Sequence, residues 1–348
     1  MAWLESRHLD SRKVNFDPHL LEYAEDMKCG NWSRERRAGK AGRPLAPSTI
    51  NGRMDYAVDF LLWAASKELR DPFPVPTRSY SYSFATGTYT HASTKQGRVH
   101  AGRRRPDPIN LRLPGMEELH SWIAEVERRK GYTKGLACRT ILGSGIRRAE
   151  GAELPLTFLP MRRADWNVGP DGRVRFLLTD GTKGGKSRIV TIPLRLAEEI
   201  HRYRLTKRVW ALAKWIKANP GEPKPARLFL GAYDGTPISA ATIYDAWTVA
   251  GPFEGWSPHL GRHTWACYEL LDALKSEATT AGFGPASVPV TWLESAAKTL
   301  MSIVITPNLG HVDERTTNTY LQWLRFQLTM PAAYSAWHEF LSAGNDNG

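Results

Sequence analysis

The stretch Ser257-Pro258-His259-Leu260-Gly261-Arg262-His263-Thr264 carries the strongest local signal in the chain. Serine is favoured at the N-cap of a helix and proline at its first position, so a helix is predicted to begin after Ser257. His259 and Arg262 are three residues apart and therefore share one face of the first turn. Unpaired backbone N–H groups and the positive end of the helix dipole lie in the same turn. The stretch therefore predicts an anion-binding site.

A second stretch, residues 309–320, reads Leu-Gly-His-Val-Asp-Glu-Arg-Thr-Thr-Asn-Thr-Tyr. The sequence Pro307-Asn308-Leu309-Gly310 predicts a turn that presents His311. A helix from about residue 313 is expected to carry Tyr320 in its middle. Taken singly, a histidine or a tyrosine on a helix is more often a packing residue than a catalyst. The two stretches together place several polar side chains in an order that packing does not explain.

Amino-acid composition and net charge narrow the kinds of molecule that the protein is expected to bind. The 348 residues include 42% apolar residues, which is enough for two domains with cores of their own. The net charge of +12 points to a nucleic acid first and an anionic membrane second. No apolar run reaches the roughly 18 residues that span a membrane, and the N-terminus lacks an apolar signal-peptide core. We therefore expect no membrane partner and a cytosolic location.

The number and spacing of the cysteines argue against a disulfide-stabilised protein and against a zinc protein. The three cysteines, Cys29, Cys138 and Cys267, are isolated and odd in number. A disulfide framework or a zinc site is therefore not expected. Each cysteine is instead predicted to be a small buried apolar residue.

The remaining patterns predict a mainly α protein with a small antiparallel β-sheet, an α+β catalytic domain. Residues 1–75 are expected to form a helical domain, with a helix that Ser48 caps. Residues 76–110 are rich in Pro, Ser, Thr and Arg and are expected to be a basic linker or irregular extension. Residues 111–326 are expected to form the second domain, and residues 327–348 a tail with one amphipathic helix.

Within the second domain, helices are predicted at about 113–126, 134–142, 146–154, 194–216 and 239–247. Two strands, 173–178 and 188–192, flank a glycine-rich tip that carries Lys183 and Lys186. This pattern indicates a β-hairpin, and residues 158–168 are expected to supply a third strand.

As a set and in this order, the motifs resemble those of the tyrosine recombinases, the phage-integrase family. The first box of that family is similar to residues 145–150, and its lysine hairpin is similar to residues 183–188 followed by Pro193. Its His-x-x-Arg-His-Thr box matches residues 259–264. Its Leu-Gly-His box, with a tyrosine nine residues after the histidine, matches residues 309–320. The resemblance covers roughly residues 111–325.

The resemblance implies a catalytic set, which consists of Arg147, Lys183, His259, Arg262, His311 and the nucleophile Tyr320. Glu150 and His263 are implied as supporting residues. The register of the strand and Pro193 favours Lys183 over Lys186 as the catalytic lysine, and both assignments stay open. The sequence departs from the family's pattern in two places. Gly261 replaces an apolar residue and is expected to loosen the helix, and residues 281–305 look like an insertion.

The implied mechanism needs no metal and no cofactor. Arg147 and Arg262 neutralise the non-bridging oxygens of a phosphodiester, and Tyr320 attacks the phosphorus. His259 is expected to accept a proton or to support as a donor, and His311 to donate to a non-bridging oxygen. Lys183 is expected to protonate the leaving 5′ oxygen. The product is a 3′-phosphotyrosyl link, from which strands exchange through a Holliday junction.

The implied partner is double-stranded DNA that carries recombination sites. The family implies a two-domain clamp with a core-binding domain at residues 1–75, and a homotetramer with one dimer on each of two sites. A partner recombinase or accessory proteins, and a location in the bacterial cytoplasm or nucleoid, fit the same picture. A solvated linker remains an alternative to a linker that contacts DNA. The basic residues of the linker and hairpin that are expected to contact DNA are Arg98, Arg103, Arg104, Arg105, Lys186 and Arg188.

Three functions remain to be separated. The first is site-specific recombination in the integration, excision or transposition of a mobile element. The second is strand cutting of the type IB topoisomerase kind, which needs no partner site. The third is a DNA-binding or architectural protein that does not cut.

Overall fold

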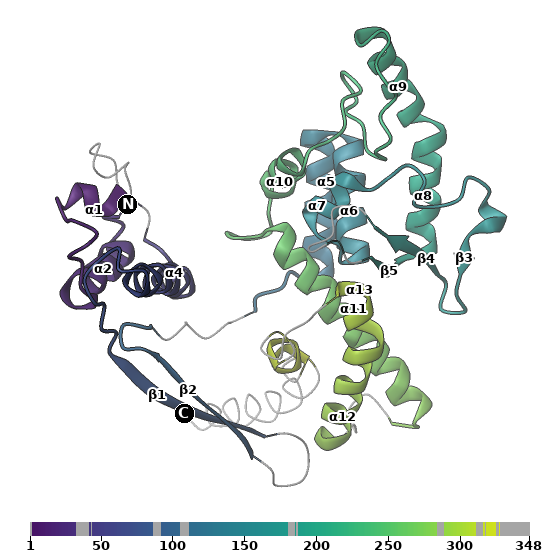
Figure 1. The fold of residues 1–348 in the computed structure, drawn as a ribbon. Coiled ribbons are helices and arrows are strands. Elements are labelled where there is room, and N and C mark those ends of the chain that lie inside the picture. The colour runs from purple at the N-terminus through teal and green to yellow at the C-terminus, as the bar shows by residue number, and fades with distance from the viewer. Residues whose placement is uncertain are drawn as a thin grey trace, which may run out of the picture. The chain divides into compact units, whose positions relative to one another are not determined.

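The computed structural model describes residues 2–32, 42, 44–85, 92–104, 111–179, 185, 187–283, 289–310, 316, 318–324 and 327 (Figure 1). The chain divides into two compact units, Met1–Asn110 and Leu111–Gly348. The fold class expected from the sequence is confirmed, because the units are mainly helical and the second contains a small antiparallel sheet.

The first unit has a helical core. Its elements are α1 (Ala2–Ser6), the π-helical turn η1 (Phe16–Leu20), α2 (Leu21–Cys29) and α4 (Pro47–Ser66). The helix predicted here is confirmed as α4, whose side chains Ile50, Met54 and Val58 are buried. The predicted cap is wrong: α4 begins at Pro47, and Ala46 occupies the N-cap without a side-chain hydrogen bond. Proline at the first position starts the helix two residues earlier than a cap at Ser48 would.

The segment expected to be an irregular linker contains a β-hairpin instead. Strands β1 (Thr77–Ala85) and β2 (Ala92–His100) pair antiparallel over nine residues each. The signal was the alternation of serine with aromatic residues in Ser79-Tyr80-Ser81-Tyr82-Ser83-Phe84, which has the period of a strand. The end of the hairpin and the residues after it bind back to α4, where Asp55 accepts hydrogen bonds from His100 and Arg103. This stretch is therefore part of the first unit's structure.

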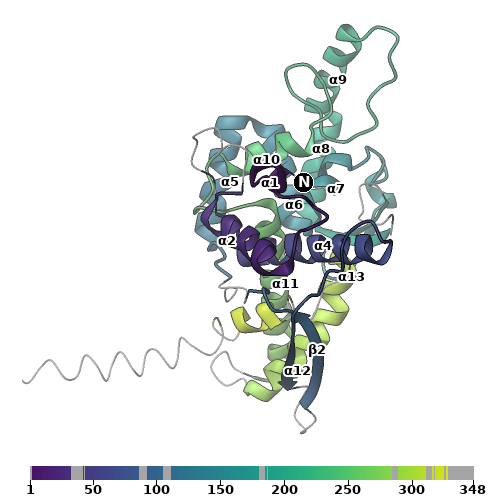
Figure 2. The same cartoon turned by 60° about the vertical axis from the view of Figure 1, so that its left-hand side comes forward.

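The second unit contains most of the helices. They are α5 (Met116–Lys130), α6 (Tyr132–Ser144), α7 (Arg148–Glu153), α8 (Leu194–Leu205), α9 (Lys207–Ala218), α10 (Ala240–Thr248), α11 (Pro258–Thr280), α12 (Val290–Leu300) and α13 (Thr306–Leu309), with helical turns η2 (Arg163–Asp165) and η4 (Met301–Ile305). The single helix predicted for 194–216 is two helices, because Thr206 leaves the helical conformation between α8 and α9. In both views α9 extends beyond the rest of the unit (Figures 1 and 2).

The predicted hairpin is confirmed and forms most of a three-stranded sheet. Strands β3 (Asn167–Val168), β4 (Arg173–Leu178) and β5 (Arg188–Pro193) pair antiparallel in that order. Val174 lies opposite Ile192 and Phe176 opposite Val190, and all four are buried. The hairpin tip, residues 180–184 and 186, lies outside the described residues. The alternation of buried and exposed side chains fixes which face of the hairpin packs on the unit.

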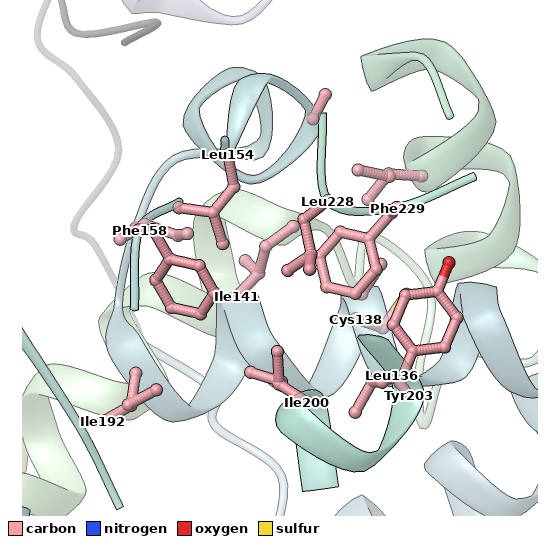
Figure 3. Close-up of a cluster of buried hydrophobic side chains, with 14 of the residues drawn as sticks. Leu136, Cys138, Ile141, Leu154, Phe158, Ile192, Ile200, Tyr203, Leu228 and Phe229 are labelled. Carbon is pink, nitrogen blue, oxygen red and sulfur yellow. The ribbon is translucent and has the colours of Figure 1, made fainter. Parts of the chain in front are cut away.

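Two apolar clusters hold the second unit together. In the first, Leu136, Cys138 and Ile141 of α6 pack with side chains of β5, α8 and residues 228–229 (Figure 3). The second joins α11 to α12, η4 and the helical residues 318–324. Cys138 and Cys267 are buried as expected, whereas Cys29 is exposed, so the prediction for that cysteine is wrong. Among the described residues, no helix is long and apolar enough to cross a membrane.

Candidate active site

The start of α11 is built as the sequence predicts. Ser257 is the N-cap, and its hydroxyl accepts a hydrogen bond from the backbone N–H of Leu260 at 3.4 Å. Pro258 occupies the first helical position. His259 is exposed at the surface of this turn, His263 is partly buried, and Arg262 is buried with 7% of its surface exposed. One face of the helix therefore presents three basic side chains at increasing depth.

Tyr320 meets this face from a part of the chain 57 residues away. It lies in the helical residues 318–324, is 1% exposed and packs in the cluster formed by α11 and α12. Its hydroxyl oxygen is 2.7 Å from Nδ1 of His263. Nε2 of His263 is in turn 3.1 Å from Nε2 of His259. The structure thus brings two of the predicted catalytic residues together through the supporting histidine.

Arg262 links two more of the predicted boxes. Its Nη1 donates to the carbonyl oxygen of Gly145 at 2.6 Å, and its Nη2 donates to the carbonyl oxygen of Leu309. Gly145 begins the first box and Leu309 the last. A guanidinium has five N–H groups. These two bonds therefore orient Arg262 and use only two of its five N–H groups.

A buried carboxylate organises the arginines beside Arg262. Glu150 is fully buried and accepts from the backbone N–H of Arg147 at 2.6 Å and from Nη1 of Arg147 at 3.0 Å. Arg188 donates to both carboxylate oxygens of Glu150, at 2.8 and 2.7 Å. Although burial raises the pKa of Glu150, the hydrogen bonds from Arg188 and Arg147 outweigh it and lower that pKa. Glu150 therefore orients Arg147 as a supporting residue.

The position of Arg188 differs from the one expected of a DNA contact. Its side chain is 10% exposed, and Nε donates to the carbonyl oxygen of Asn308 at 2.7 Å, in addition to the two bonds to Glu150. Three donor atoms of this guanidinium are therefore bonded within the protein. Arg188 therefore joins β5 to the first box and to the residues before His311.

Asn308 is a site residue that the sequence did not single out. It is 3% exposed, its Oδ1 accepts from the backbone N–H of Thr191 at 2.8 Å, and its Nδ2 donates to the carbonyl oxygen of Ser144 at 3.0 Å. The sequence presents it only as one residue of a turn. A polar residue with partners this distant in the sequence is recognisable only in the folded chain. It ties the hairpin strand and the end of α6 to α13.

The electrostatics of the site favour an anion. Burial, together with the nearby positive charge of Arg147, lowers the pKa of Arg262 to about 10. Burial also lowers the pKa of His263 to about 4, with contributions from His259 and Arg262, and it lowers the pKa of His259 in the same way. Both histidines are therefore neutral near pH 7. The positive charges of Arg262 and Arg147 repel each other, and a negative group that binds between them reduces this repulsion.

Two glycines make room for tryptophans beside the site. A Cβ on Gly145, which ends α6 at φ +66°, would lie 2.4 Å from the ring of Trp265. A Cβ on Gly261 would lie 2.2 Å from the ring of Trp247, which is fully buried. The helix runs unbroken through Gly261. The expected loosening is therefore not seen, and this glycine is explained by close packing.

We expect Gly261→Ala to destabilise the second unit by about 1–3 kcal/mol, because the new methyl group forces the Trp247 ring to move. Chemical denaturation followed by circular dichroism measures this change. Gly52→Ala in the interior of α4 is the matched control, since nothing lies within 4 Å of its Cβ position. That substitution is expected to stabilise by up to about 1 kcal/mol through helix propensity. Equal effects of the two substitutions would contradict the packing explanation.

The other residues predicted for the site are distributed as follows. His311, Lys183, Lys186 and Arg105 lie outside the described residues, and so does the side chain of Arg98. Two predicted DNA contacts have carboxylate partners within the first unit: Arg103 bonds to Asp55, and Arg104 bonds to Glu25.

Comparison with known proteins gives similarities among solved structures. No protein-family model and no curated protein matches the chain. The chain is similar to XerH site-specific recombinase bound to palindromic difH substrate, with 17% identity and a TM-score of 0.47, over 94% of this chain and 73% of that one. It is also similar to the Tn1549 transposon integrase in complex with circular intermediate DNA, with 16% identity and a TM-score of 0.42, over 91% of this chain and 85% of that one.

A third similar structure is the catalytic domain of bacteriophage HP1 integrase, with 17% identity and a TM-score of 0.34, over 64% of this chain and 93% of that domain. These structural neighbours belong to the family that the sequence motifs resemble.

Proposed function

We propose that this chain is a tyrosine-type site-specific DNA recombinase that cuts and rejoins strands through a 3′-phosphotyrosyl link. The observation that supports it most is the hydrogen bond between Tyr320 and His263, next to Arg262. A phenol, two imidazoles, the buried guanidinium of Arg262 and the partly exposed guanidinium of Arg147 belong to this site. Such a set suits attack on a phosphodiester better than it suits packing.

Each group has a role in the proposed reaction. Arg262 and Arg147 bind the non-bridging oxygens, and they bind the transition state more tightly because it carries more negative charge. The hydroxyl oxygen of Tyr320 forms a bond to phosphorus and gives up its proton to the pair of His259 and His263, while the bond from phosphorus to the 5′ oxygen breaks. The leaving oxygen takes a proton from Lys183, with Lys186 as the alternative. His311 donates to a non-bridging oxygen.

The bond energy is kept in the phosphotyrosine, so a 5′-hydroxyl of another strand can attack it and restore the phosphodiester. Repetition on the second pair of strands passes through a Holliday junction. The proposal extends to four copies of the chain on two DNA sites, with residues 1–75 on the core of each site. Integration, excision or transposition of a mobile element is the proposed biological setting.

The proposal is tested by capture of the covalent intermediate. The probe is a set of nicked duplexes that tile the DNA flanking the gene for this chain, since the site is not known in advance. A nick beside the cleaved phosphate lets the short product diffuse away and traps the adduct. We expect protein-linked DNA after denaturation, with the link at Tyr320 by peptide mass spectrometry. Binding of the duplexes without any adduct would instead favour the non-cutting DNA-binding protein.

The topoisomerase alternative is separated by a second assay. A supercoiled plasmid that lacks the DNA sequence identified by covalent trapping is incubated with the protein, and its relaxation is followed on a gel. A topoisomerase relaxes this plasmid, whereas a recombinase acts only on plasmids with paired sites. Relaxation of the plasmid without sites would overturn the recombinase proposal while leaving the phosphotyrosine chemistry in place.

A further inference from the structure

The histidine that follows Arg262 is in direct contact with the nucleophile, and the histidine three residues before Arg262 is in contact with that histidine. Nδ1 of His263 is 2.7 Å from the Tyr320 oxygen, whereas His259 meets His263 through its Nε2 at 3.1 Å. The general base for a nucleophile must lie within hydrogen-bond reach of its proton. By this criterion His263 is the better placed of the two.

We propose that His263 is the residue that accepts the proton of Tyr320 during strand cleavage, and that His259 holds it in the required tautomer. This inference rests on the proposed function. Nε2–H of His263 donates to Nε2 of His259, which leaves Nδ1 of His263 unprotonated and able to accept. As the Tyr320 oxygen bonds to phosphorus, its proton passes to Nδ1, and His263 becomes an imidazolium. The proton for the leaving 5′ oxygen comes from a different group.

The surroundings suit this transfer. Tyr320 is 1% exposed, His263 is partly buried and His259 is exposed, so the three side chains lead from a buried hydroxyl towards solvent. His263 is neutral before DNA binds, since the burial of its ring and the neighbours His259 and Arg262 keep its pKa at about 4. A bound phosphate adds negative charge beside these groups and Arg147, which favours the imidazolium.

The decisive variant is His263→Asn. The asparagine amide can stand where Nδ1 stood and accept a hydrogen bond from Tyr320, but it cannot accept the proton. We expect the single-turnover cleavage rate on the captured duplex to fall by about 10²- to 10⁴-fold. The rate in the variant should keep rising with pH, by up to about tenfold per pH unit, because hydroxide must take the proton, whereas the wild-type rate should level off once His263 is neutral. An unchanged rate and slope would overturn the proposal.

A modified substrate separates a base on Tyr320 from an acid on the leaving group. In a duplex with sulfur in place of the bridging 5′ oxygen, the leaving thiolate needs no proton. The ratio of wild-type to His263→Asn rates should be the same for the sulfur and oxygen substrates. If sulfur restores the variant to the wild-type rate, His263 acts on the leaving group and the proposal is wrong.

The tautomer is tested on the protein without DNA. Nitrogen-15 NMR of the histidine rings is expected to show His263 protonated at Nε2, with Nδ1 as an acceptor whose shift changes in Tyr320→Phe. The opposite tautomer would contradict the proposal even if cleavage were seen. A wild type that never forms an adduct would instead refute the proposed function, so the two failures are distinct. The same spectra show whether His263→Asn is folded.

Discussion

Tyr320→Phe is expected to abolish covalent attachment to DNA, with a loss of about 10⁴-fold or more in cleavage rate. The substitution removes the only atom of this side chain that can bond to phosphorus. It keeps the ring, which packs in the cluster of α11 and α12, so the fold should persist. The expected change in stability is about 1 kcal/mol, the usual worth of one hydrogen bond. Trapping on the nicked duplex measures the loss, and circular dichroism checks the fold.

DNA binding provides the internal control for this variant. Arg262 and Arg147 remain in place, so affinity for the duplex should stay within a few-fold of the wild type in a filter-binding assay. Tyr203→Phe is a matched variant, because Tyr203 is also about 1% exposed and hydrogen-bonded but lies in the other cluster of the same unit. Cleavage by Tyr203→Phe should persist. Equal adduct formation by Tyr320→Phe and the wild type would refute the assignment of the nucleophile.

Glu150→Gln is expected to lower the free energy of unfolding by about 3–5 kcal/mol, the effect of removing one partner from a buried ion pair. The neutral amide leaves Arg188 and Arg147 close together without the negative charge that they share. Their N–H groups also lose carboxylate acceptors at distances below 3.1 Å. Urea denaturation followed by circular dichroism measures the effect. A loss below 1 kcal/mol would show that the network contributes little.

The pH dependence gives a second check on Glu150. Its pKa in the folded protein is below the ordinary value of 4.5. The stabilisation from this shift is therefore fully present above about pH 4.5, and it is lost as the pH falls through the folded-state pKa. Accordingly, the difference in stability between the wild type and Glu150→Gln should be constant near neutral pH and shrink in acid. A difference that grows in acid would have the wrong sign.

Glu125→Gln separates a buried carboxylate from an exposed one. Glu125 on α5 bonds to Arg128 and Arg129, and these hydrogen bonds lower its pKa to about 2. These three side chains are at the surface, where water screens the attraction between their charges, so the ion pairs contribute little to stability. The urea midpoint should therefore hardly move in this variant, although the carboxylate has two arginine partners, as Glu150 has.

Local patterns predicted the parts of the fold that depend on local physics. The cap at Ser257 is present as predicted, because an N-cap is decided by one side chain and the next turn. The hairpin of β4 and β5 has the predicted strand at 173–178, because alternation and glycine signal it within a short window. The β1–β2 hairpin was missed because composition was given more weight than its period-two alternation.

Long-range contacts account for what the sequence did not predict. The motifs named Arg147, Arg262 and Tyr320, but only the fold shows that His263 lies between Tyr320 and His259. Likewise, Arg188 looked like a surface charge because its partners, Glu150 and Asn308, are 38 and 120 residues away. A basic residue is expected at the surface unless a partner is known, and no window of sequence contains these partners.

Several of the bonds that orient the site end on backbone carbonyl oxygens. Arg262 holds the carbonyl oxygens of Gly145 and Leu309, Asn308 holds that of Ser144, and Arg188 holds that of Asn308. A carbonyl oxygen is the same in every residue type. Leu309 could therefore be exchanged for another apolar residue without moving the acceptor that Arg262 uses, provided that the backbone keeps its path. The geometry of the site is in this sense insensitive to much of the sequence around it, and mutational drift can proceed there while the arginines stay aligned.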